Sequence, residues 1–128
     1  MRPKVITTFR HCIAIAVTLG LAVPSAGAQD ATRGKAVYEA CIVCHKLDPK
    51  STDQGPTLIG VIGRRSGALD DFRYSRAIVR ANIVWDESTL DAYLADPQSY
   101  IVGMRMPFGG IPDKAERADL IAYLKMLR

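Results

Sequence analysis

Two cysteines and a histidine form the most informative group in the chain. Residues 41–45 read Cys-Ile-Val-Cys-His, so two residues separate Cys41 from Cys44, and His45 follows directly. This spacing is typical of covalent haem attachment, because both thiols can add to the porphyrin vinyl groups while the imidazole reaches the iron. We therefore predict one haem c, bound through Cys41 and Cys44, with His45 as an axial ligand of the iron.

Three other uses of these residues are less consistent with the sequence. A thiol–disulfide redox pair belongs at a strand-to-helix junction, and no strand-like alternation of useful length is present. A structural zinc site needs four ligands, and only Cys41, Cys44 and His45 remain once the first 28 residues are set aside. A disulfide between the two cysteines would strain so short a loop. Covalent haem is the favoured interpretation.

A second axial ligand must come from another residue type, because His45 is the only histidine after residue 28. A methionine thioether is a usual partner of histidine in haem proteins. Three methionines remain. Met126 falls in a predicted helix, where a packing role is ordinary. Met104 and Met106 both lie in the loop 103–107, and the residues alone leave the choice between them open.

The first 28 residues have the pattern of a secretory signal peptide. The first ten contain three basic residues and no acidic one, residues 12–23 are apolar, and small residues precede a cleavage point at about Ala28. The apolar run is shorter than the roughly 20 residues that span a bilayer. We expect cleavage there and export to the periplasm. The alternative is an uncleaved anchor.

Charge and composition narrow the functional class. The whole chain has 128 residues and a net charge of +4, but three of its 17 basic residues and none of its 13 acidic residues lie in the leader. The mature chain, residues 29–128, is therefore close to neutral and forms one small domain. Nucleic-acid binding loses its electrostatic support. With 48% hydrophobic residues, the composition is that of a folded protein.

The elements that must position these side chains are helical. Apolar spacing, capping residues and prolines predict helices over about 30–44, 75–80, 86–96 and 113–127. Trp85 and Leu90 are spaced to pack together at the start of the third of these. The stretches 47–71 and 103–112 are rich in glycine and proline and predict loops. Loops this long in an all-α domain need a large object to pack on, which a buried cofactor would supply.

From residue 34 to 127 the chain resembles the class I cytochromes c. The resemblance is carried by Cys41 to His45, Gly55-Pro56-Thr57-Leu58, Gly63-Arg64, Phe72-Arg73-Tyr74, Trp85, Tyr100 with Gly103 to Met106, and Asp119 to Leu124. It implies an all-α class I cytochrome c fold, in which loops and short helices wrap around one covalent haem. It also implies that the first and last helices cross, with Gly34 and Tyr38 meeting Leu120 and Tyr123.

The same resemblance implies the second axial ligand. The family pattern places it just before a turn containing phenylalanine and glycine, which matches Met106. Met104 stands where the family usually has a small hydroxyl residue near a haem propionate. The carbonyl of Pro56 matches the one that accepts the second ring N–H of the ligating histidine, here His45.

Further site roles follow by position. Arg64, Tyr74 and Trp85 match the residues that hold the buried propionate. Tyr93 matches the tyrosine whose hydroxyl lies near the methionine sulfur, and Phe108 matches the aromatic residue that shields the haem edge.

The function implied is that of a periplasmic single-electron carrier rather than an enzyme, since histidine and methionine fill both axial positions. Its expected donor is a membrane quinol oxidoreductase or a dehydrogenase, and its acceptor an oxidase, reductase or reaction centre. We expect a monomer that binds no nucleic acid and meets the membrane only through its partners. A dedicated haem subunit of one enzyme complex, and a haem-based gas sensor or weak peroxidase, are the alternatives.

Overall fold

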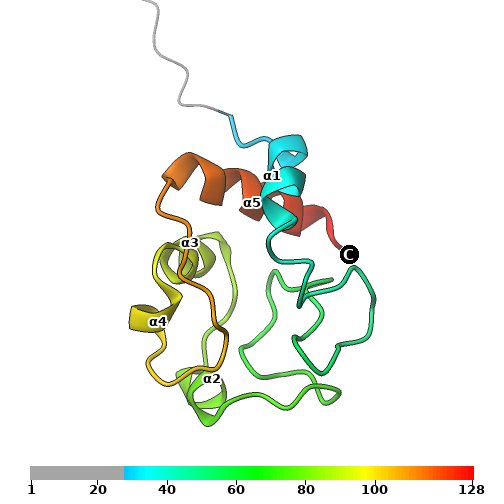
Figure 1. Cartoon of the computed structure of the whole chain (residues 1–128), viewed down its shortest axis with the longest axis vertical. Coiled ribbons are helices and arrows are strands. Elements are labelled where there is room, and N and C mark those ends of the chain that lie inside the picture. Colours follow the sequence, from blue (N-terminus) through cyan, green and yellow to red (C-terminus); the bar gives the residue numbers. More distant parts are fainter. Residues whose placement is uncertain (1–27) are drawn as a thin grey trace, which may run out of the picture.

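The computed structural model describes residues 28–128 (Figure 1). The predicted leader, residues 1–28, lies outside this range except for its last residue, so its cleavage stays a prediction. The five helices of the described part are α1 (Ala31–Tyr38), α2 (Arg76–Ala81), α3 (Glu87–Ala95), α4 (Pro97–Tyr100) and α5 (Lys114–Met126). Within residues 28–128 the only β pairing is an isolated bridge between Arg65 and Val84. The prediction of an all-α fold is confirmed.

The first helix is shorter than the predicted span of 30–44. The Asp30 side chain caps α1 by accepting hydrogen bonds from two backbone N–H groups, and the helix ends at Tyr38. Beyond it, the N–H groups of Cys41 and Ile42 both donate to the Tyr38 carbonyl, and those of Cys44 and His45 both donate to the Cys41 carbonyl. Successive tight turns thus replace the helix, and the Cys-x-x-Cys-His segment lies in them.

The middle helices begin where the capping residues predict. Asp86 and Thr89 form a reciprocal capping box at the start of α3, which ends at Ala95, two residues before Pro97. The chain then forms one further turn, α4, which lies outside the helices predicted from the sequence. Pro97 occupies the first position of this turn, and the Asp96 side chain accepts a hydrogen bond from the Ser99 N–H.

Helices α1 and α5 cross and pack against each other, as the resemblance implies (Figure 1). The rings of Tyr38 and Tyr123 meet edge to face with centroids 5.3 Å apart. Arg33 of α1 pairs with Asp119 of α5 at 2.7 Å, and the Asp30 N–H donates to the same carboxylate at 2.7 Å. These contacts tie the beginning of the described chain to its last helix.

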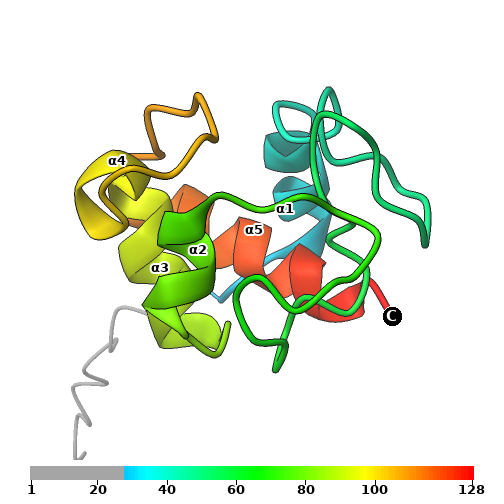
Figure 2. The same cartoon turned by 90° about the horizontal axis from the view of Figure 1, so that it is seen from below.

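Seen from below, α5 runs across the molecule behind two separate groups of segments (Figure 2). The turns and loops that follow α1 lie on one side, and α3, α4 and the loop before α5 lie on the other. Buried apolar side chains join them into one core, which includes Val61, Leu90, Ile101 and Leu120. No helix among residues 28–128 has both the length and the apolar character needed to cross a membrane.

Candidate haem site

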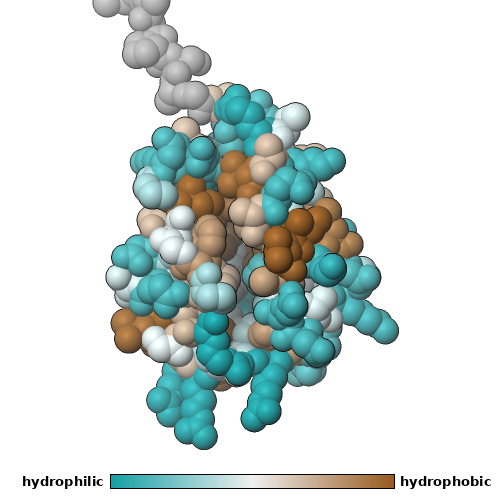
Figure 3. All heavy atoms as spheres, viewed as in Figure 1, coloured by the Kyte–Doolittle hydropathy of each residue, from teal (hydrophilic) through white to brown (hydrophobic). Residues whose placement is uncertain are grey.

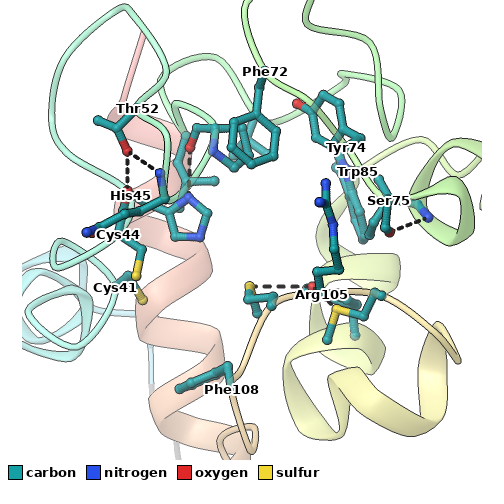
Figure 4. A pocket seen from close by; sticks show the side chains of 18 of the residues that line it. Cys41, Cys44, His45, Thr52, Phe72, Tyr74, Ser75, Trp85, Arg105 and Phe108 are labelled. Carbon is teal, nitrogen blue, oxygen red and sulfur yellow. Dashed lines mark hydrogen bonds between the residues drawn. The ribbon is translucent and has the colours of Figure 1, made fainter.

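A large cavity lies between the two groups of segments. Its volume is about 720 Å³, which is within the usual range for small-molecule and cofactor sites. The space-filling view shows a hollow near the middle of this face, with apolar residues gathered around its upper part and hydrophilic residues below it (Figure 3). The close-up shows side chains entering the cavity from opposite sides (Figure 4).

Cys41 and Cys44 lie together on one wall, and no disulfide joins them (Figure 4). Burial, and next the neighbouring Cys44, raise the pKa of the Cys41 thiol to about 11. A thiol–disulfide exchange pair requires the opposite, a thiol whose pKa is lowered so that the thiolate forms near neutral pH. This environment therefore disfavours the redox-pair interpretation of the two cysteines.

His45 lies beside the cysteines, and a backbone carbonyl orients its ring. Its Nδ1 lies 2.7 Å from the Pro56 carbonyl oxygen. Since a carbonyl can only accept, Nδ1 carries the hydrogen, and Nε2 keeps its lone pair. Burial lowers the pKa of His45, while the Pro56 carbonyl opposes this shift. The imidazole is therefore neutral at pH 7, which is the form that binds metal ions.

Gly55 provides the room for this ring. A Cβ at that position would lie 3.0 Å from both Cε1 and Nδ1 of His45, and 2.9 Å from the Cys44 carbonyl oxygen. A side chain there would displace the imidazole or the turn that carries it. The resemblance includes Gly55 as part of a motif, and the structure supplies the steric reason for glycine.

The opposite wall carries two thioethers, Met104 and Met106, and the cavity brings both near one phenol. The Tyr93 hydroxyl lies 3.2 Å from the Met104 sulfur and 3.6 Å from the Met106 sulfur. Met104 is 7% exposed, and Met106 is half-buried. Met126 lies away from the cavity and is 66% exposed. The structure thus narrows the candidate thioether ligands to the two in the loop.

Arg64, Tyr74 and Trp85 all line the cavity, as the resemblance implies. The Arg64 guanidinium donates to the carbonyls of Thr57 at 2.6 Å and Ile59 at 3.2 Å. Burial lowers the pKa of Arg64 somewhat. Within residues 28–128 this half-buried cation forms no ion pair with a carboxylate. A buried cation of this kind is suited to an anionic group of a ligand.

Three side chains that hold the ligand-bearing loops in place have no signature in the sequence. The Tyr38 hydroxyl donates to the His45 carbonyl at 2.6 Å. The Gln98 side-chain amide donates to the Met106 carbonyl at 2.7 Å. The Arg105 guanidinium donates to the Arg73 carbonyl across the cavity. No sequence pattern marks these contacts, because each joins a side chain to the backbone of another segment.

The cavity residues fit a covalently held haem. Two thiols and a neutral imidazole face two thioethers, and the walls between them are mainly apolar. Arg64, which has no carboxylate partner among residues 28–128, borders the cavity. Phe108 also lines it, from the loop that carries the two methionines (Figure 4). Among residues 28–128, no group of three or more His, Cys, Asp or Glu side chains could hold a metal ion by itself. Two thiols, one imidazole and two thioethers are the donor set of a covalent haem site.

Comparison with known proteins agrees with this description. The family model described as cytochrome c matches residues 31–128, which is nearly all of the described chain. Cytochrome c2 of Blastochloris viridis is 41% identical over 108 residues, covering 84% of this chain and 85% of that protein. Cytochrome c type-1 of Ascaris suum is 46% identical over 97 residues, covering 75% of this chain and 87% of that protein.

A solved structure shows the same architecture. Cytochrome cH from Methylobacterium extorquens superposes with a TM-score of 0.72 at 38% sequence identity. The match covers 76% of this chain and 98% of that one.

Proposed function

The chain belongs to the cytochrome c family, and we propose that it works as a periplasmic single-electron carrier. It is a class I cytochrome c with a covalently bound haem c, and like the rest of the family it carries electrons and is not an enzyme. The proposal adds the attachment of the haem at Cys41 and Cys44, the compartment, the axial ligands and the partners. Donors would be a membrane quinol oxidoreductase or a dehydrogenase, and acceptors an oxidase, reductase or reaction centre.

The observation that supports this most is the placement of His45 and two thioethers on opposite walls of one cavity. When bound, the haem supplies an iron that takes up and releases one electron at a time. His45 would offer Nε2 to that iron from one side, and Met106 its sulfur from the other. If the chain held both axial positions in this way, no position would stay open for a small substrate, which favours electron transfer over catalysis or gas sensing.

Hydrogen bonds within the chain fix the positions of the two proposed axial ligands. The Pro56 carbonyl fixes the orientation of the His45 ring, and its hydrogen bond makes the imidazole a better donor to the iron. The Tyr38 hydroxyl holds the His45 backbone, and Gln98 holds the Met106 backbone. Ligands whose orientation is fixed in both redox states need little rearrangement when an electron arrives or leaves.

We assign Met106 rather than Met104 as the sulfur ligand. The Gln98 hydrogen bond positions the Met106 backbone, and Pro107 and Phe108 follow as the resemblance implies. Arg64, Tyr74 and Trp85 would hold the buried propionate, since a buried carboxylate is costly without N–H or O–H donors. Phe108 would cover the haem edge near Cys41, where electrons enter and leave.

Purification from the periplasmic fraction tests attachment, compartment and leader cleavage together. Intact mass should equal the chain from about residue 29 plus one haem, and the haem should stay with the protein in acid-acetone because thioether bonds join them. C41A and C44A variants should each retain a single linkage, and the double variant none. Haem that extracts freely from the unmodified protein would refute covalent attachment.

Replacement of methionines by leucine tests the ligand assignment. M106L should abolish the weak long-wavelength absorption band of the ferric protein that reports an iron–sulfur bond, and should lower the reduction potential, because a thioether favours ferrous iron. M126L, at the exposed methionine of α5, is the matched control and should leave both unchanged. Persistence of the band in M106L would overturn the assignment of Met106.

A further inference from the structure

The Tyr93 hydroxyl has two sulfur acceptors but only one hydrogen. It lies 3.2 Å from the Met104 sulfur and 3.6 Å from the Met106 sulfur, and within residues 28–128 it has no other acceptor. Tyr93 is itself only 8% exposed, so water does not compete freely for the hydroxyl. The two methionine sulfurs therefore compete for a single hydrogen bond, and the shorter distance favours Met104.

We propose that Met104 tunes the reduction potential by taking the Tyr93 hydrogen bond that would otherwise go to the Met106 sulfur. Met104 is thus a positioning residue that acts through Tyr93. The inference rests on the proposed assignment of Met106 as the axial ligand. It goes beyond that assignment, because it gives the second, non-ligating methionine of the loop a specific effect on the iron.

The direction of the effect follows from the chemistry of the thioether. A sulfur that accepts a hydrogen bond gives up some of its lone-pair density, so it donates less to ferric iron and favours the ferrous state more strongly. When Met104 accepts the Tyr93 hydrogen bond, the Met106 sulfur keeps its lone-pair density and is a better electron-pair donor to the iron. Met104 therefore keeps the potential lower than it would be if Tyr93 donated to Met106 alone.

The residues around Tyr93 and Met104 keep the hydroxyl and the Met104 sulfur close together. Burial raises the pKa of Tyr93 to about 12, so its hydroxyl stays protonated and remains a donor at any physiological pH. The Tyr93 ring is fixed between Trp85 and Tyr100, with centroids 4.9 Å and 6.1 Å away. Met104 is 7% exposed and belongs to the buried core, so its sulfur has little freedom to leave the hydroxyl.

A simple packing role for Met104 makes a different prediction. If Met104 only fills space, then Met104→Leu, which keeps the volume and removes the acceptor, leaves the potential unchanged or shifts it regardless of Tyr93. If Met104 acts through the hydroxyl, the effect of M104L must disappear once the hydroxyl is removed by Y93F. The two roles are separated by a double-mutant cycle.

The experiment measures the reduction potential and the long-wavelength sulfur band of the holoprotein in four forms: unmodified, M104L, Y93F and M104L/Y93F. M104L should raise the potential and shift the band, and the double variant should match Y93F. M126L serves as the matched control and should change neither. An unchanged potential in M104L, or an equal shift with and without the hydroxyl, would overturn the proposal.

A measurement on the unmodified ferrous holoprotein keeps the test independent of folding of the variants. Proton NMR should show a stronger nuclear Overhauser contact from the Tyr93 hydroxyl proton to Met104 side-chain protons than to those of Met106. Contacts to Met106 alone would refute the proposal. Loss of the sulfur band in M104L with its retention in M106L would instead refute the ligand assignment, and free haem in acid-acetone would refute covalent attachment, so the failures are distinguishable.

Discussion

Gly34 of α1 lies directly against the backbone of Asp119 of α5. A Cβ at position 34 would be 1.9 Å from the Asp119 carbonyl oxygen and 2.9 Å from the Tyr123 Cβ. No side-chain rearrangement relieves an overlap with backbone, so the two helices would have to separate. The crossing of the first and last helices therefore depends on the absence of a side chain at this one position.

Gly34→Ala should destabilise the holoprotein by about 3 kcal/mol, the upper part of the usual range for overpacking. The gain of about 1 kcal/mol from replacing a helical glycine by alanine does not offset this cost. Denaturant unfolding measures the difference. Gly109→Ala is the matched control, because a Cβ there meets nothing within 4 Å, and it should change stability by less than about 1 kcal/mol. Equal stability of the two variants would contradict the role assigned to the crossing.

Acid should weaken the same crossing. A side-chain hydrogen bond from Arg33, and next the Asp30 N–H, hold the pKa of Asp119 below its ordinary value of 3.8. A lowered pKa means that the folded state prefers the carboxylate. The stabilisation is present above about pH 3.8 and is lost as the pH falls further.

Thermal unfolding of Asp119→Asn against pH checks this expectation. The variant should unfold at a lower temperature than the unmodified protein at pH 7, and the gap should narrow below about pH 4 as the native carboxylate is protonated. Asp53→Asn is the control, at an exposed carboxylate outside this network, and should follow the unmodified protein throughout. If the unfolding temperatures of D119N and the unmodified protein differed by the same amount at every pH, the charge of the Asp119 carboxylate would contribute nothing to stability.

Gly55→Ala should disturb the axial histidine rather than the helices. The added methyl group would lie 3.0 Å from the His45 ring, closer than an ordinary contact, so the imidazole must tilt or the turn must shift. We expect a loss of stability of about 1–3 kcal/mol, together with altered NMR shifts of the His45 ring protons in the ferrous holoprotein. Gly109→Ala again serves as the control. Unaltered ring shifts in G55A would show that the turn yields without moving the ligand.

Association with a redox partner should depend only weakly on salt. At the positions that the resemblance places around the haem edge, the exposed charges are mixed, with Lys35, Arg105 and Lys114 opposed by Asp53 and Asp113. Screening acts over about 8 Å at physiological ionic strength, so a mixed face steers little. The second-order electron-transfer rate with the native oxidase or reductase should fall less than about tenfold between low and physiological salt. A steeper fall would indicate a concentrated charged surface.

The features that depend on local chemistry could be predicted from the residues alone. The Cys41–His45 spacing indicated covalent haem because both thiols and the imidazole must come from one short segment. The helix starts at Asp86 and Asp113 were predictable because capping is a contact between near neighbours in the chain. The all-α class followed from apolar spacing and from the absence of strand-like alternation.

Relationships between distant segments could not be predicted from the sequence. Two examples are the room that Gly55 leaves for His45 and the position of the Tyr93 hydroxyl beside two sulfurs. Each depends on a distance between residues that the chain brings together only on folding. Sequence could name Met104 and Met106 as candidates. Only the folded structure shows that the Tyr93 hydroxyl lies within hydrogen-bond distance of both methionine sulfurs. This arrangement depends on how the methionine loop packs against α3.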